Sequence, residues 1–160
     1  EMLHKIYPCL WFDGQAEEAA RLYTSVFPNS RVLETARYPD AMPDMAGKVM
    51  TVVFELDGQK VMGLNGGPEF KFSEAVSFVV DCDTQAEVDA LWEKLTANGG
   101  EESQCGWLKD PFGMSWQIVP VEMNEMMSDP DPAKVNRVTQ AMLQMRKLDV
   151  AKLREAYNAG

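Results

Sequence analysis

Residues 105–120 read Cys-Gly-Trp-Leu-Lys-Asp-Pro-Phe-Gly-Met-Ser-Trp-Gln-Ile-Val-Pro. In the turn Asp110-Pro111-Phe112-Gly113, proline presets one φ angle and glycine accepts a positive one, so the two flanking arms are predicted to pair as an antiparallel hairpin. The second arm alternates with period two, which places Gln117 on the face opposite Trp116 and Ile118. If that face lines a cavity, Gln117 is the first residue to consider as part of a site.

The segment before this hairpin predicts a strand followed by a helix. Residues 76–81 have strand character, and residues 84–98 carry a helical stripe. Thr84 and Glu87 form a capping box at the helix start, and Gly99-Gly100 ends the helix. With a strand near residues 101–104 and the two hairpin arms, the order is βαβββ.

The first half of the chain predicts the same order. Helical spacing of apolar residues begins at Ala16, and Asp57-Gly58 is a tight hairpin signal. Strands are predicted at residues 6–12, 30–37, 48–56 and 59–64. The fold class is therefore α+β, with two βαβββ modules forming curved mixed sheets.

We expect one domain over residues 1–160. It is divided into module one (5–66), a connector (67–74), module two (75–120) and a C-terminal helical tail (121–160). In the tail, Asp131-Pro132 and Asp149 are helix start signals. The tail could pack on its own module or on a second subunit.

Composition narrows the possible partners and location. The formal net charge of −10 argues against nucleic-acid binding, which depends on clustered Lys and Arg. Three cysteines without close pairing are typical of a reduced, cytoplasmic protein. The sequence has no evident secretory leader and no apolar run long enough to span a bilayer, so we expect no membrane association.

Four long strings, together with the doubled βαβββ order, carry a family resemblance. They are residues 10–19 (LWFDGQAEEA), 62–67 (MGLNGG), 105–120, and 142–149 (MLQMRKLD). The chain resembles the PhnB-like branch of the vicinal oxygen chelate superfamily, whose members are often labelled 3-demethylubiquinone-9 3-methyltransferase. The resemblance implies a glyoxalase and bleomycin-resistance-like fold, a cup over a ligand cavity, and a homodimer.

The resemblance also implies where a metal would bind. Metal-using relatives place ligands on the first and last strands of each module, which here correspond to Ile6 or Pro8, Asn65, Ser77 and Gln117. None is a histidine or a carboxylate, and neutral amides and hydroxyls are weak ligands for transition metals. The single histidine, His4, precedes the first strand. We therefore expect no standard metal site and no cofactor.

A cavity without a metal can still bind a small-molecule ligand. The predicted ligand-binding residues are Gln117, Asn65, Ser77, Tyr7, Trp107 and Cys105. The sequence does not settle which faces Trp11, Trp107 and Trp116 occupy. Cys105 could be a reactive thiol or a small buried residue, and Lys109 could pair with Asp110 across the turn while Asp110 caps the turn.

Three other functions compete with ligand binding. One is a metal-assisted lyase, isomerase or dioxygenase in which Gln117 and Asn65 orient substrate oxygens, and another is an assembly module with a filled cup. Methyl transfer fits the residues poorly, because Gly63, Gly66 and Gly67 follow a hairpin strand rather than opening a helix. The sequence leaves open whether any reaction is catalysed.

Overall fold

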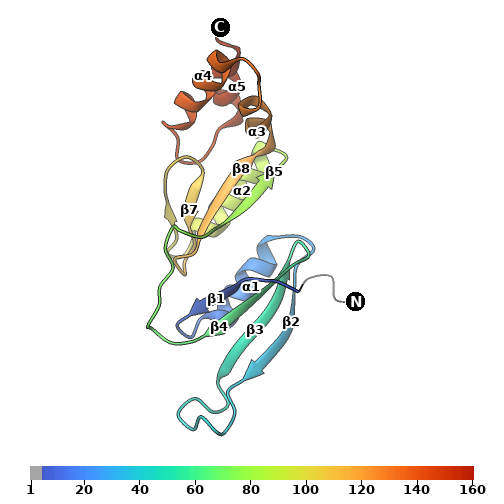
Figure 1. The fold of residues 1–160 in the computed structure, drawn as a ribbon, viewed down its shortest axis with the longest axis vertical. Coiled ribbons are helices and arrows are strands. Elements are labelled where there is room, and N and C mark those ends of the chain that lie inside the picture. Colours follow the sequence, from blue (N-terminus) through green and yellow to red (C-terminus); the bar gives the residue numbers. More distant parts are fainter. Residues whose placement is uncertain (1–4) are drawn as a thin grey trace. The chain divides into compact units, whose positions relative to one another are not determined.

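The chain forms two units, each built on a four-stranded mixed sheet with a helix on one face (Figure 1). The computed structural model describes residues 5–160. The first unit ends at Lys71 and the second runs Phe72–Gly160, so the division falls inside the predicted connector. The predicted α+β class is confirmed.

The first unit has the strand order β1-β4-β3-β2, with β1 parallel to β4 and the other pairs antiparallel. Asp57 and Gly58, with φ of 49° and 80°, form the predicted tight turn between β3 and β4. The elements are β1 (Cys9–Phe12), α1 (Ala16–Val26), β2 (Arg31–Arg37), β3 (Val49–Leu56) and β4 (Gln59–Asn65).

The first strand is shorter than predicted. It begins at Cys9 rather than at residue 6, and Ile6 is 92% exposed. Pro8 has no backbone N–H to donate to a ladder, although its carbonyl oxygen still accepts from the Met62 N–H at 3.0 Å. The strand was predicted three residues too long because residues 6–8 continue the apolar run but do not form the full ladder of hydrogen bonds.

Helix α1 lies close against its sheet because β4 carries a glycine beneath it. A Cβ on Gly63 would lie only 3.1 Å from the Cβ of Ala16. Ala16, Ala19 and Ala20 are fully buried. Small residues on both sides of the contact let the helix and sheet backbones approach closely.

The second unit repeats the strand arrangement of the first. Its order is β5-β8-β7-β6, with β5 parallel to β8, so the internal duplication predicted from the sequence is confirmed. Thr84 caps α2 by accepting from the Glu87 N–H at 3.1 Å. The elements are β5 (Ser77–Cys82), α2 (Gln85–Thr96), β6 (Glu101–Glu102), β7 (Trp107–Lys109) and β8 (Ser115–Pro120).

The C-terminal tail packs on its own unit through a cluster of apolar side chains. It contains α3 (Val121–Met127), α4 (Pro132–Met142) and α5 (Val150–Asn158), and α3 had not been predicted separately. Asp131 and Asp149 cap α4 and α5 as expected. The buried members of this cluster are Val119, Met123, Met126, Val138, Leu148 and Leu153.

The tail also forms hydrogen bonds with the backbone just before β7. The Cys105 and Gly106 N–H groups donate to the carbonyl oxygens of Met145 and Arg146, each at 2.8 Å. Leu148 covers Gly106 so closely that a Cβ there would lie 2.8 Å from its Cδ1 atom. These contacts of the tail fix the backbone at the start of β7, the strand that pairs with β8. Within residues 5–160, no helix combines the length and apolar character needed to cross a membrane.

Candidate functional site

One face of the second sheet is covered by α2. On the opposite face, which we call the helix-free face, Val119 at the end of β8 is buried against the tail helices, and the rest of the face lies away from them. Trp116 and Ile118 are buried on the α2 side, and Gln117 between them is half-buried on the helix-free side, as the alternation predicted. Trp107 and Val79 are its register partners on β7 and β5, so both share its face. Val79 is 59% exposed. The helix-free face is therefore open to solvent at Val79, and Gln117 beside it is partly accessible.

Gln117 and Ser77, two of the predicted site residues, are in direct contact. The Gln117 Nε2 atom donates to the Ser77 hydroxyl at 2.9 Å, across the parallel pair β8 and β5. Within residues 5–160, the Gln117 amide oxygen accepts no hydrogen bond, and the Ser77 hydroxyl proton has no acceptor. Both side chains thus keep hydrogen-bonding capacity.

Ser115 belongs to the same face and was not predicted from the sequence. It lies two residues before Gln117 on β8, and its register partner on β5 is Ser77. Its residue is 1% exposed, and its hydroxyl has no hydrogen-bond partner among the described residues. The period-two spacing from Gln117 was the signal that could have found it.

A salt bridge lies beside these hydroxyls. Lys109 is the register partner of Ser115 on β7, and its Nζ atom is 2.6 Å from a carboxylate oxygen of Glu74. The hydrogen bond from Lys109 lowers the pKa of Glu74 and raises that of Lys109. The pair predicted between Lys109 and Asp110 is therefore corrected: the structure gives Lys109 a different partner.

Asp110 points into the hairpin instead. Its Oδ1 atom accepts from the Phe112 and Met114 N–H groups at 2.9 and 3.0 Å, which confirms the predicted side-chain cap of the turn. Its Oδ2 atom accepts from the indole N–H of Trp116 at 2.9 Å. Trp116 therefore belongs to the core of the second unit and not to the helix-free face.

Asn65 lies on the helix side of the first sheet. Its Oδ1 atom accepts from the Ala16 N–H at 2.9 Å, and its Nδ2 atom donates to the Val49 carbonyl oxygen at 3.1 Å. Asn65 shares the parity of Gly63, which contacts α1, so its side chain faces the helix. Ligand binding by Asn65 stays a prediction. Its amide serves as a cap for the first turn of α1.

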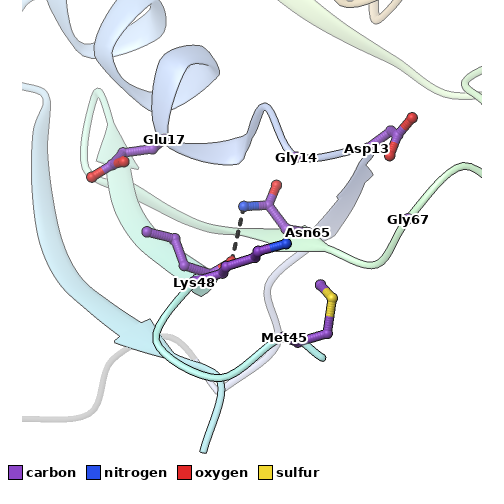
Figure 2. A pocket seen from close by; sticks show the side chains of 8 residues that line it. Asp13, Gly14, Glu17, Met45, Lys48, Asn65 and Gly67 are labelled. Carbon is purple, nitrogen blue, oxygen red and sulfur yellow. Dashed lines mark hydrogen bonds between the residues drawn. The ribbon is translucent and has the colours of Figure 1, made fainter. Parts of the chain in front are cut away.

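A pocket of about 470 Å³ lies beside Asn65, at the start of α1 (Figure 2). The side chains around it come from the β1–α1 turn, the start of α1, the segment before β3 and the end of β4, and both signs of charge are present. It is lined by Asp13, Gly14, Glu17, Met45, Lys48, Val49, Asn65 and Gly67. Gln117 is not among the residues that line this pocket, so Asn65 and Gln117 do not belong to one common site.

The other predicted site residues have local partners. The Lys60 Nζ atom lies 4.0 Å from the centre of the Tyr7 ring. Trp11 donates its indole N–H to the Gly67 carbonyl oxygen at 2.8 Å and packs edge-on against Phe70. Cys105 is half-buried with φ of 60°, so the expectation of a buried residue is met in part. Ligand binding by Tyr7 and Cys105 stays a prediction.

The donor set implied for a metal does not fit one. Within residues 5–160, no group of three or more His, Cys, Asp and Glu side chains is placed to hold a metal ion. At the family positions, Gln117 and Ser77 bond to each other, and Asn65 is engaged by backbone groups. His4 lies outside the described residues. Neutral amide and hydroxyl oxygens would leave the charge of a transition metal unneutralised.

The family follows from a comparison with known proteins. A model of the family described as 3-demethylubiquinone-9 3-methyltransferase matches residues 4–119. The chain belongs to this family. A putative 3-demethylubiquinone-9 3-methyltransferase, the PhnB protein from Bacillus cereus, is 34% identical with a TM-score of 0.66. The match covers 73% of this chain and 99% of the Bacillus protein.

Two more distant structures share the fold of the family. Protein PA1353 from Pseudomonas aeruginosa is 21% identical, with a TM-score of 0.59 over 73% of this chain and 97% of that chain. The fosfomycin resistance protein FosX from Listeria monocytogenes, complexed with Mn(II) and sulfate, is 14% identical, with a TM-score of 0.53 over 74% and 92%. No curated protein matches the chain. The resemblance to the PhnB-like family is confirmed, and the likeness to FosX shows that the fold is shared.

Proposed function

We propose that this protein binds a small organic molecule on the helix-free face of its second sheet, next to Gln117, Ser77 and Trp107. The observation that carries the proposal is the 2.9 Å hydrogen bond between Gln117 and Ser77. It fixes the amide in one orientation while the amide oxygen stays without a partner among the described residues. A polar group held in this way loses little entropy when a ligand binds.

The surroundings suggest the shape of the ligand. Trp107 lies directly across from Gln117 on β7, and Val79 lies across from it on β5. An indole ring and a valine offer apolar contact, while the amide and hydroxyl offer hydrogen bonds. A small molecule with one flat apolar part and one polar edge matches this arrangement.

Methyl transfer, as in the description of the family, finds little support in the glycines. A Cβ on Gly66 would lie 2.3 Å from the Trp11 ring, and one on Gly63 would press on Ala16. These glycines thus serve close packing within the first unit. The Ala16 N–H in the first turn of α1 already donates to Asn65.

A metal-assisted lyase, isomerase or dioxygenase is the second candidate, because the fold is shared with FosX, whose structure contains Mn(II). The neutral side chains at the corresponding positions favour binding without a firmly held transition metal. We also propose a cytoplasmic homodimer. The free state of Cys9, Cys82 and Cys105 supports a reducing compartment.

The test uses phenol as a neutral probe. Its titration should shift the side-chain amide resonance of Gln117 in ¹⁵N-labelled protein. Gln117→Leu should abolish binding and change the free energy of unfolding by less than about 1 kcal/mol, because the volumes are similar. Gln144→Leu, an exposed amide on the tail, is the matched control and should bind phenol normally. If neither phenol nor any co-purified molecule found by native mass spectrometry affects Gln117, the face serves assembly and the proposal is wrong.

A further inference from the structure

The hydroxyl of Ser115 is buried without a hydrogen-bond partner among the described residues. Leaving a buried hydroxyl unpaired costs roughly 1–3 kcal/mol of stability. An alanine at this position would avoid that cost. The serine at this position therefore indicates that its hydroxyl has a hydrogen-bond partner from outside the chain.

Three donors surround the place where that partner would lie. Ser115 is on the central strand β8, and its register partners on the two neighbouring strands are Ser77 and Lys109. Side chains at such positions share a face and lie about 5 Å apart. Ser77 accepts from Gln117, so its own proton stays available. The group presents two hydroxyl protons and one ammonium.

We propose that Ser115 and Ser77 donate to the two oxygens of a carboxylate on the ligand, and that Lys109 neutralises its charge. The inference rests on the proposed function and names the chemical class of its ligand. Ser115 is then a binding residue whose partner is supplied only by the ligand. Lys109 faces two carboxylates, Glu74 in the ion pair and Glu101, its register partner on β6, so the ligand carboxylate has to displace Glu74 from Lys109.

The ion pair with Glu74 shows that a carboxylate can bind the Lys109 ammonium group. The Glu74 oxygen is 2.6 Å from the Lys109 Nζ atom, and the Glu74 side chain is 62% exposed. An ion pair this exposed is worth less than about 1 kcal/mol, so a ligand carboxylate can replace it. The Glu74 side chain is therefore an internal competitor for the ligand.

Benzoate is the probe, because it joins a carboxylate to a ring that Trp107 can contact. Benzoate should bind at least about tenfold more tightly than phenol, since hydrogen bonds to a charged group are the stronger kind. Ser115→Ala should weaken benzoate binding by about tenfold or more and should leave the melting temperature of the free protein unchanged or raised. Ser128→Ala, an exposed serine on the tail, is the control and should bind benzoate normally.

Glu74→Gln provides a second variant at an exposed position. It should strengthen benzoate binding by up to about fivefold, because the competing carboxylate is gone. Unchanged benzoate affinity in Ser115→Ala, or a fall in its melting temperature with no change in affinity, would overturn the inference. If phenol shifts Gln117 but benzoate does not bind, the inference is wrong and the proposed function stands. If neither probe binds, both are wrong.

Discussion

The side-chain amide of Gln85, at the start of α2, donates to the Leu148 carbonyl oxygen at 3.0 Å and accepts from the Val150 N–H at 2.8 Å. Beside it, Lys147 forms an ion pair with Asp89 at 2.9 Å. The family match ends at residue 119, so these contacts attach a segment that lies beyond the matched part of the chain. Through residues 145–148, the same segment holds the backbone before β7.

Gln85→Leu should loosen this attachment. It leaves the Leu148 carbonyl and the Val150 N–H without their partner, and both residues are buried. We expect a loss of roughly 1–3 kcal/mol in the free energy of unfolding, measured by urea denaturation. Hydrogen exchange at the Cys105 and Gly106 amides should become faster, because their acceptors lie in the loosened segment.

Gln144→Leu is the matched control for this prediction. Gln144 is exposed beside the same tail segment, and its side chain makes no hydrogen bond to the described residues. Its substitution should leave both stability and exchange unchanged. Equal exchange rates at Cys105 in the two variants would show that the tail does not depend on Gln85.

Much of the fold could be predicted because its signals are local. The turns Asp57-Gly58 and Asp110-Pro111-Phe112-Gly113, the Thr84 cap and the helix starts at Asp131 and Asp149 each depend on a few adjacent residues. The alternation around Gln117 likewise fixed its face, since strand parity is set within one strand.

The site could be predicted only in part because it depends on contacts between distant segments. The partners of Asn65 could not be predicted, because its contact with Ala16, 49 residues away, exists only in the folded chain. The partner of Lys109 is Glu74, 35 residues away. The sequence around Ser115 does not distinguish it from other serines. Its burial without a hydrogen-bond partner is seen only in the folded structure.

Asp110 should prove important for the stability of the second unit. Its carboxylate accepts from the Phe112 and Met114 N–H groups and from the Trp116 indole, and the residue is 2% exposed. Asp110→Ala should lower the free energy of unfolding by roughly 3 kcal/mol or more, because several buried donors lose their acceptor together. Asp40→Ala, at an exposed loop position, is a suitable control. A loss below about 1 kcal/mol for Asp110→Ala would contradict the inward role of this carboxylate.

Gly106 and Gly113 allow the tail contact to be separated from backbone strain. Their φ angles are nearly equal, 88° and 90°, but a Cβ would meet Leu148 only at Gly106. Each alanine variant should lose about 1–2 kcal/mol from the left-handed backbone. Gly106→Ala should lose more than Gly113→Ala by about 1 kcal/mol or more, because Leu148 must shift. Equal losses in thermal denaturation would mean that Leu148 yields without cost.

Tyr157 should make the tail sensitive to pH at both ends of the range. Its hydroxyl donates to the Asp129 carboxylate, which raises the pKa of Tyr157 and lowers that of Asp129. A raised tyrosine pKa gives stability that is complete below about pH 10, the ordinary value, and is lost as the pH rises through the folded-state pKa. A lowered aspartate pKa gives stability that is complete above about pH 4 and is lost as the pH falls through the folded-state pKa.

Tyr157→Phe removes the hydroxyl that links these two titrations. The difference in melting temperature between the natural protein and this variant should therefore be largest and flat between about pH 5 and 9, and should shrink toward both extremes. Tyr23→Phe, in the buried core of the first unit, controls for the loss of a tyrosine hydroxyl elsewhere. A difference that stays constant from pH 3 to 11 would show that the Asp129 contact contributes nothing to stability in solution.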